Sequence, residues 1–326
     1  MKLATVKNGH PDGRLVIVSR DLQHAVQAPV TTMQAAMETW DNVLPELQAW
    51  YENLNAGRLN AAFAFDVQAA AAPLPRAYQW CDGSAFLNHG HLMERAFNTE
   101  PIPDFETVPV MYQGSGDDFL GPHEVVPLPS VNHGIDFEGE FGVITGPVPL
   151  GTSPEQAAWH VRLLVQINDW SLRSFGPREM KTGFGFLQAK PSTAFAPVAV
   201  TPDELGDAWH EGRVELDLHI HWNGEWFGHP NGREMNFDFR QLIAHAAATR
   251  RLGAGTVIGS GTVSNKSREV GSACISERRV IEMIDQGQAR TAYMQFGDRV
   301  RMEARDAFGQ APFGVIDQEV VQSPTP

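Results

Sequence analysis

Three carboxylates stand at alternate positions of one otherwise apolar segment. Asp136, Glu138 and Glu140 occupy every second position within residues 135–144. Side chains two residues apart in a strand point to the same face, so this spacing predicts a row of acids on one face. Neighbours in such a row lie roughly 7 Å apart and repel by about 2 kcal/mol at an effective dielectric of 20. A hard cation would reverse that repulsion, although a solvated sheet face explains the same spacing.

Two other segments carry residues that would complete a cation site. Asp169 follows the apolar run 163–167, so we expect it at the end of a buried strand, and Asp82 is followed seven residues later by His89. Ligands that are all oxygen suit Mg²⁺, Mn²⁺ or Ca²⁺ rather than zinc. With a histidine as general base, such a cation could activate a carbonyl substrate. The alternative is an exposed aspartate and an ordinary surface histidine.

The order of these motifs resembles the fumarylacetoacetate hydrolase family, from Ala72 to nearly the C-terminus. The seven-residue spacing of Asp82 and His89 matches the family's first metal aspartate and its catalytic histidine. The Glu-x-Glu segment at 138–140 and the Asn-Asp-Trp-Ser segment at 168–171 match in content and in order. The resemblance implies an α+β fold with a β-rich main domain, a mixed β-sandwich roll, and a smaller N-terminal α/β domain.

The resemblance also implies a complete site. The metal ligands would be Asp82, Glu138, Glu140 and Asp169; the catalytic residues His89, Glu277 and Lys190; and the substrate contacts Arg95, Tyr112, Arg173 and Thr262.

The assignments of Arg95, Glu277 and Arg173 rest on spacing or on one of two possible roles. Arg95 and Tyr112 are seventeen residues apart, as are the arginine and tyrosine that bind substrate in the family. Strict spacing places the glutamate that orients the catalytic histidine at Ile275, so we assign Glu277 with a small shift in register. Arg173 would assist in substrate binding, or it would form an ordinary surface ion pair.

The implied function is divalent-metal-dependent cleavage of a carbon–carbon bond in a β-diketo acid, of the fumarylacetoacetate or acylpyruvate type, in aromatic or tyrosine catabolism. The cofactor would be Mg²⁺, or Ca²⁺ or Mn²⁺. Ser84 and Gly176 stand where fumarylacetoacetases carry a substrate-binding tyrosine and glutamine, so the chemistry is better supported than the named substrate. The alternatives are a hydratase, isomerase or decarboxylase of 2-oxo acids in the same superfamily, or a cation-stabilised binding protein without activity. Because family members commonly dimerise, the implied state is a homodimer.

Composition narrows the partners of this chain of 326 residues. The 25 basic against 39 acidic residues give a net charge of −14, which disfavours nucleic acid and anionic membranes and favours a small-molecule substrate. No segment approaches the ~20 apolar residues of a membrane span. Cys81 and Cys274 are far apart and form no CxxC pair, so the sequence predicts a protein of a reducing cytoplasm.

Local patterns predict how these residues are positioned. Clustered alanines and prolines at 69–75 indicate a linker, so we divide the chain into a small N-terminal domain, 1–72, and a catalytic domain, 73–326. Apolar periodicity predicts a helix over 31–54, capped by Thr31 and kinked or restarted at Pro45.

Three further elements are expected in the main domain. Asn223-Gly224 predicts a β-hairpin, Ser153 caps a helix that runs toward Leu164, and a second helix spans about 239–251. The histidines of the hairpin could bind a metal, but a solvated strand face explains their alternation better.

Overall fold

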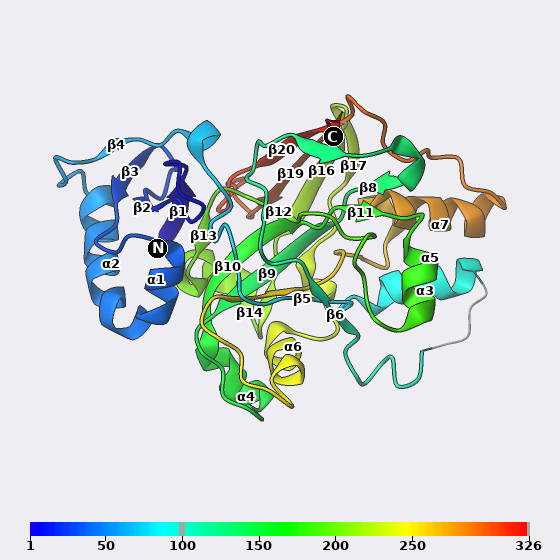
Figure 1. The fold of residues 1–326 in the computed structure, drawn as a ribbon, viewed down its shortest axis with the longest axis horizontal. Helices are drawn as coiled ribbons and strands as arrows, with labels where there is room; N and C mark the ends of the chain where they lie inside the picture. Colours follow the sequence, from blue (N-terminus) through cyan, green and yellow to red (C-terminus); the bar gives the residue numbers. More distant parts are fainter. Residues whose placement is uncertain (98–101, 325–326) are drawn as a thin grey trace.

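A long, mostly antiparallel sheet runs from the N-terminal segment to the acidic residues (Figure 1). The computed structural model describes residues 1–97 and 102–324. In spatial order the strands of the long sheet are β4 (Phe63–Ala64), β3 (His24–Gln27), β2 (Arg14–Val18), β1 (Lys2–Val6), β13 (Ala199–Val200), β10 (Val161–Asn168), β9 (Gly139–Thr145), β18 (Thr256–Gly259), β5 (Trp80–Gly83) and β6 (Met111–Gly114), with β12 (Ala194–Phe195) beside β10. The pairing of β18 with β5 is parallel.

A second sheet packs against this one and closes the main core. Its strands, in spatial order, are β17 (Glu225–Gly228), β16 (Asp217–Trp222), β19 (Arg299–Arg305), β20 (Ile316–Gln322) and β7 (Val126–Leu128). The two sheets pack closely at Gly139, because a methyl group there would sit 2.8 Å from a Leu218 methyl and 2.9 Å from Ile220. The fold is therefore the α+β, β-rich sandwich that the sequence implied.

Short elements and helices surround the two sheets. The two-stranded pairs are β8 (Ile135–Asp136) with β11 (Ser171–Leu172), and β14 (Trp209–His210) with β15 (Arg213–Val214). The α-helices are α1 (Met33–Glu38), α2 (Trp40–Asn55), α3 (Leu87–Phe97), α4 (Pro154–Ala157), α5 (Gly176–Thr182), α6 (Phe239–Ala246) and α7 (Ile275–Gln286). Within 1–97 and 102–324, no helix combines the length and the apolar character needed to cross a membrane.

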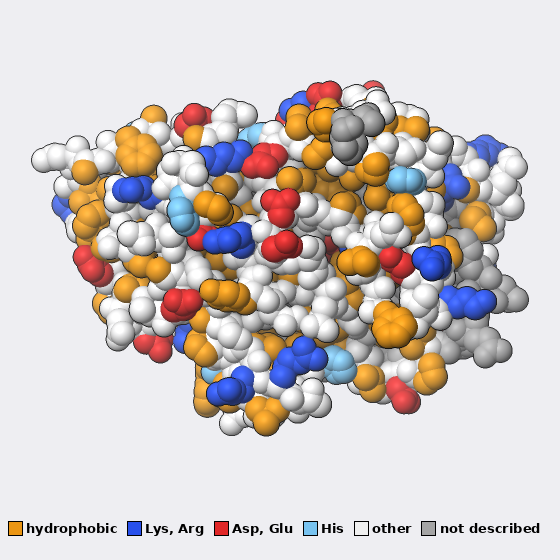
Figure 2. Space-filling model, in the orientation of Figure 1, with side chains coloured by type: hydrophobic (Ala, Val, Ile, Leu, Met, Phe, Trp, Pro, Cys, Tyr) orange, Lys and Arg blue, Asp and Glu red, His pale blue; other side chains and the backbone are white. Residues whose placement is uncertain are grey.

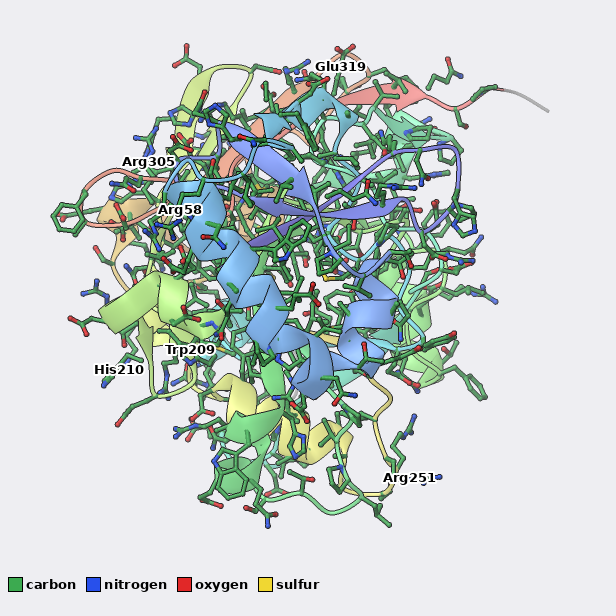
Figure 3. All side chains as sticks on the ribbon, turned by 90° about the vertical axis from the view of Figure 1, so that its left-hand side faces the viewer. Arg58, Trp209, His210, Arg251, Arg305 and Glu319 are labelled. Atoms are coloured by element: carbon green, nitrogen blue, oxygen red, sulfur yellow. The ribbon has the colours of Figure 1, made fainter. Side chains whose placement is uncertain are left out.

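The N-terminal helices and the helices near the acidic residues lie at opposite ends of the molecule. Figure 1 shows α1 and α2 at one end and α3, α5 and α7 gathered at the other. Figure 3 views the molecule from the side that carries α1 and α2, with Arg58 just beyond the end of α2. The strands before residue 72 join the main sheet through β1 and β13, and the division of the chain at residue 72 stays a prediction.

The predicted helix of residues 31–54 is two helices in the structure. Thr32, rather than Thr31, caps α1 with its side chain. The break lies at Thr39, whose backbone (φ −121°, ψ 21°) is not helical and whose hydroxyl donates to the Ala35 carbonyl at 2.7 Å. Pro45, where we expected the kink, lies inside α2.

Three expectations for the main domain have different outcomes. The hairpin is confirmed, with Asn223 and Gly224 both at positive φ as a type I′ turn requires. The capping box at Ser153 is also present, but α4 has only four residues because the chain turns into strand β10. The acidic segment 135–144 is not one strand: it divides into β8 and β9, since the N–H of Glu138 donates to the side chain of Asn168 at 3.0 Å.

Charged side chains are mixed on the molecular surface. On the face drawn in Figure 2, acidic and basic groups are interspersed, so the net charge of −14 is not concentrated in one acidic patch there.

Candidate active site and metal centre

Three buried carboxylates from separate strands converge at one point. Asp82 lies in β5, Glu140 in β9, and Asp169 directly follows β10. One oxygen from each lies within 4.8 Å of the others, and all three residues are buried. We call this group the acidic trio.

The acidic trio fits a hard divalent cation. Both carboxylate oxygens of Glu140 are buried and have no hydrogen-bond partner among the described residues. Asp82 accepts a hydrogen bond from the N–H of Gly261 at 3.0 Å, and Asp169 accepts one from the Thr193 hydroxyl at 2.7 Å. Unpaired buried carboxylates are strongly unfavourable unless a proton or a cation compensates them. The donor set, oxygen alone, is the one that Mg²⁺, Mn²⁺ and Ca²⁺ prefer.

The electrostatics of the acidic trio agree with this fit. Burial, followed by the neighbouring charge of Asp169, raises the pKa of Asp82 to about 8. Burial, followed by the charges of Asp82 and Asp169, raises the pKa of Glu140 well above its usual range. The charged forms are therefore disfavoured as long as no cation is shared between them.

Glycines beside the acidic trio make room for Asp82. Gly259 pairs with Asp82 across β18 and β5, and a Cβ at Gly259 would clash with the Asp82 carboxylate. Gly261 turns at φ +75°, which lets its N–H reach the same carboxylate. The glycine-rich segment 259–261 thus shapes the acidic site.

Glu138 lies beside the acidic trio with both oxygens engaged by cations. Lys190 Nζ donates to Glu138 at 2.8 Å and to Asp169 at 2.6 Å. The Arg173 guanidinium lies 2.6 Å from the other oxygen of Glu138. Burial would raise the pKa of Glu138, but Lys190 and Arg173 outweigh burial and lower it. Burial would lower the pKa of Lys190, but the charges of Asp169 and Glu138 outweigh burial and raise it, so the ammonium stays charged.

A histidine and a glutamate form a hydrogen-bonded pair next to these carboxylates. His89 Nδ1 lies 2.7 Å from a Glu277 carboxylate oxygen, between helices α3 and α7. Because an ionised carboxylate only accepts hydrogen bonds, Nδ1 carries the proton and Nε2 is left to accept one. Glu277 is 1% exposed and His89 17%. His89 is near enough to Glu138 for a positive charge on the ring to lower the pKa of that carboxyl.

Comparison with known families agrees with this arrangement. Residues 79–321 match the family described as the C-terminal part of fumarylacetoacetate (FAA) hydrolase, and residues 1–76 match fumarylacetoacetase N-terminal domain 2. The chain belongs to the fumarylacetoacetate hydrolase family. This family consists of enzymes, and the relatives of this chain include hydrolases and isomerases.

Individual proteins are similar to this chain in sequence or in fold. The 2,4-didehydro-3-deoxy-L-rhamnonate hydrolase of Sphingomonas sp. (strain SKA58) is 32% identical over 165 residues, which are 50% of this chain and 54% of that protein. The chain therefore matches about half the length of such curated relatives. Maleylpyruvate hydrolase from Sphingobium sp. SYK-6, in complex with manganese(II) ion and pyruvate, is 17% identical with a TM-score of 0.65, over 99% of this chain and 100% of that one. The 5-carboxymethyl-2-hydroxymuconate delta-isomerase from Mycobacterium smegmatis is 16% identical with a TM-score of 0.61, over 100% of both chains. At these identities the two structures show a common fold.

The substrate-binding residues implied by the family lie in different settings. The Tyr112 hydroxyl donates to Asp169 at 2.5 Å, beside the acidic trio. Thr262 is buried directly after Gly261. Arg95 lies in the last turn of α3 with an exposed side chain. All of these substrate roles stay predictions.

Arg173 does not make the surface ion pair that was its alternative role. Its side chain is 23% exposed and lies against two buried carboxylates, Asp136 and Glu138. Its role in substrate binding also stays a prediction.

Sequence reasoning missed two residues that contact the candidate site. Thr193 bonds to Asp169, and its position three residues after Lys190 was the available signal. Phe186 packs edge-on against Tyr112 with ring centroids 5.0 Å apart, and nothing in the local pattern distinguishes it from other aromatic residues.

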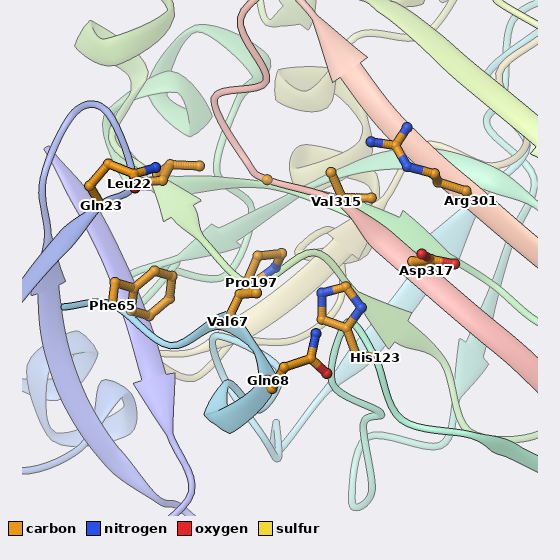
Figure 4. Close-up of a pocket in the computed structure, with 11 residues that line it drawn as sticks. Leu22, Gln23, Phe65, Val67, Gln68, His123, Pro197, Arg301, Val315 and Asp317 are labelled. Atoms are coloured by element: carbon orange, nitrogen blue, oxygen red, sulfur yellow. The ribbon is translucent and has the colours of Figure 1, made fainter.

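A separate hollow of about 410 Å³ lies between the N-terminal strands and the second sheet (Figure 4). Its wall includes Phe65, His123 and Arg301, and none of its lining residues belongs to the acidic trio or to the His89–Glu277 pair. The Arg301 guanidinium already donates to both oxygens of Glu303, at 2.6 and 2.9 Å. The hollow is thus apart from the site chemistry.

Proposed function

We propose that this chain is a divalent-metal-dependent hydrolase that cleaves a carbon–carbon bond in a β-diketo acid of the acylpyruvate type. The observation that carries the proposal is the juxtaposition of three buried carboxylates, of which Glu140 has no hydrogen-bond partner among the described residues, with a histidine–glutamate pair and a largely buried lysine side chain. The carboxylates suit a cation, the histidine suits proton transfer, and the lysine suits a negative charge that develops between them.

The relatives support the same substrate class. The similar Sphingomonas protein is named as the hydrolase of a didehydro-deoxy sugar acid, and the similar Sphingobium structure is a maleylpyruvate hydrolase with manganese(II) and pyruvate. We infer a 2-oxo acid group as the part of the substrate nearest to the metal, and Mg²⁺, or Mn²⁺ or Ca²⁺, as the ion.

Asp82, Glu140 and Asp169, together with Glu138, would hold the ion. When bound, it would neutralise these carboxylates and polarise a substrate carbonyl. The roles of the protein's own groups follow from their contacts. Lys190 presents a positive charge between Glu138 and Asp169, and this charge helps to lower the pKa of Glu138.

His89 would act as general base at Nε2. It takes a proton from water, whose oxygen adds to the distal carbonyl carbon of the substrate, while Glu277 stabilises the imidazolium through Nδ1. The bond between that carbon and the neighbouring methylene carbon then breaks, and its electron pair goes to the 2-oxo acid fragment. The proton held by His89 passes to this fragment, so the diketo acid and water yield a carboxylic acid and a 2-oxo acid.

The far end of the substrate would be recognised by the remaining family positions. Tyr112 donates to Asp169, and Thr262 directly follows Gly261, whose N–H binds Asp82. We assign Arg95 to a distal carboxylate because an arginine fork suits that group. Ser84 and Gly176 offer less side chain than the tyrosine and glutamine of fumarylacetoacetases, which favours a different acyl group. The homodimer implied by the family also stays a proposal.

The test is a panel of acylpyruvates, fumarylacetoacetate and 2-hydroxydienoates, assayed with Mg²⁺, with EDTA, and with the His89→Ala variant. We expect release of a 2-oxo acid and a carboxylic acid with Mg²⁺, loss of turnover in EDTA, and a loss of roughly 10²- to 10⁴-fold in kcat for His89→Ala. Turnover that is indifferent to EDTA would contradict the metal assignment. A product with the mass of the substrate would instead indicate an isomerase.

A further inference from the structure

Asp136 is a buried carboxylate that contacts donors on two separate elements. One oxygen accepts the N–H of Ile275 at 2.7 Å, and the other accepts the N–H of Ser276 at 2.9 Å. Arg173 Nε donates to the second oxygen at 2.8 Å. Asp136 itself is 0% exposed. Asp136 takes no part in the proposed chemistry.

The first contact fixes the start of helix α7. The first N–H groups of a helix have no partner within the helix, and a carboxylate there is favoured by the helix dipole. The N-cap residue Cys274 offers only its sulfur, which accepts the N–H of Glu277 at 3.3 Å. Asp136 is therefore the charged acceptor next to this terminus. Glu277, one residue after Ser276, is the partner of His89.

The second contact reaches the carboxylate side of the site. Arg173 Nη2 forms ion pairs with Asp136 at 2.8 Å and with Glu138 at 2.6 Å. Glu138 in turn accepts a hydrogen bond from Lys190. Asp136 thus stands between the histidine–glutamate pair and the group formed by Glu138 and Lys190.

We infer that Asp136 is a positioning residue that holds the start of α7, and with it Glu277 and His89, in register with the carboxylate side of the site. This inference rests on the proposed function, in which His89 is the base. Asp136 touches no reacting atom, so it acts through the geometry of the pair. A displacement of about 1 Å in a catalytic group can reduce turnover roughly 10²-fold.

The chain contains a matched control for a purely structural role. Asp238 is also buried, also caps a helix, α6, and also pairs with an arginine. It accepts the N–H groups of Arg240 and Gln241 at 2.8 and 3.2 Å, and the Arg240 guanidinium at 2.7 Å. Helix α6 carries none of the proposed site residues, so Asp238→Asn should affect folding but not the histidine–glutamate pair.

The kinetic test combines each aspartate variant with His89→Ala. With Mg²⁺ and an acylpyruvate, we expect Asp136→Asn to lower kcat roughly 10- to 100-fold while KM changes less than about 2-fold. In the His89→Ala background the same change should lower kcat less than about 3-fold, because the residue it positions is gone. Asp238→Asn should change kcat less than about 3-fold in both backgrounds. An equal loss from Asp136→Asn with and without His89 would overturn the inference.

A second measurement does not depend on turnover. The His89 Nδ1–H proton, bonded to Glu277, should give a downfield imidazole resonance that is absent from His89→Ala. We expect Asp136→Asn to lose or broaden this resonance and Asp238→Asn to keep it. If Asp136→Asn fails to fold, Asp136→Glu, which keeps the charge but moves it by one methylene, should shift the same resonance. A resonance unchanged in the Asp136 variant would overturn the inference. If the wild-type protein hydrolyses no acylpyruvate but Asp136→Asn still loses the resonance, the positioning role is supported and the proposed hydrolase function is contradicted.

Discussion

Replacing Asp82 with asparagine should stabilise the metal-free protein, because the structure makes ionisation of this residue unfavourable. Burial and the charge of Asp169 raise the pKa of Asp82 to about 8, from an ordinary value of 3.8. Between these values the folded state keeps a proton that the unfolded state has released. The free energy of unfolding therefore falls as the pH rises from about 4 to about 8, by about 1.4 kcal/mol per pH unit. At pH 7 the accumulated penalty is about 4 kcal/mol.

The Asp82→Asn variant removes this penalty without removing the local hydrogen bond. The asparagine oxygen can still accept the N–H of Gly261, and its amide can donate to Glu140 or Asp169. With about 2.1 cal/mol/K of unfolding entropy per residue, a gain of 4 kcal/mol corresponds to about 6 °C in Tm for this chain. Mg²⁺ should stabilise the wild-type protein in the same pH range, because a bound cation favours the ionised carboxylates. It should stabilise the variant much less.

Thermal and urea unfolding at pH 5 and pH 8, each in EDTA and in Mg²⁺, would measure these differences. Asp207→Asn, at an exposed aspartate, is the control for loss of a surface charge. A metal-free wild-type protein that is equally stable at both pH values would refute the reasoning. So would an Asp82→Asn variant that is less stable than wild type in EDTA at pH 8.

Two further predictions concern Lys190 and the loop before it. Lys190→Met leaves two buried carboxylates without their shared cation, so it should lower the free energy of unfolding in EDTA by about 3–5 kcal/mol, measured by urea unfolding. An equal loss of unfolding free energy in the exposed control Lys181→Met would contradict this prediction. Glu179 accepts the backbone N–H groups of residues 187–189 at 2.8–3.1 Å and so closes the loop. Glu179→Ala should therefore speed chymotrypsin cleavage at Phe184, which is 97% exposed, and an unchanged cleavage rate would show that the loop is held by other contacts.

Local sequence patterns were sufficient for elements whose geometry is set by a few neighbouring residues. Asn223-Gly224 predicted the hairpin because both positions of its turn require positive φ. The capping box at Ser153 is present, but the length of its helix was wrong, since strand β10 recruits the following residues into the sheet. The helix break at Thr39 was missed because the backbone leaves the helical conformation there and not at Pro45, which lies inside α2.

The candidate site also combines features that local spacing predicted with features that depend on tertiary contacts. Spacing in the sequence identified Asp82 and Glu140 as candidate ligands, since each lies in a short motif of fixed spacing. The choice of Glu277 over Ile275 depended on register, and the structure places Glu277 within 2.7 Å of His89. Asp136 contacts Ile275 and Ser276 at the start of α7, which follow it by 139 and 140 positions in the sequence. No local pattern encodes contacts over such separations.

The sequence by itself determined the family, the α+β class and the identity of the acidic and histidine residues, because these depend on residue types at short, fixed separations. Only the tertiary structure decided which acids are paired. It pairs Glu138 with Lys190 and Arg173, and it places Asp136 at the start of a helix. Within the part of the chain that the structure describes, Glu140 has no donor. The physical reason is that the energy of a buried charge depends on the donors within a few ångströms, and here those donors come from distant segments of the chain.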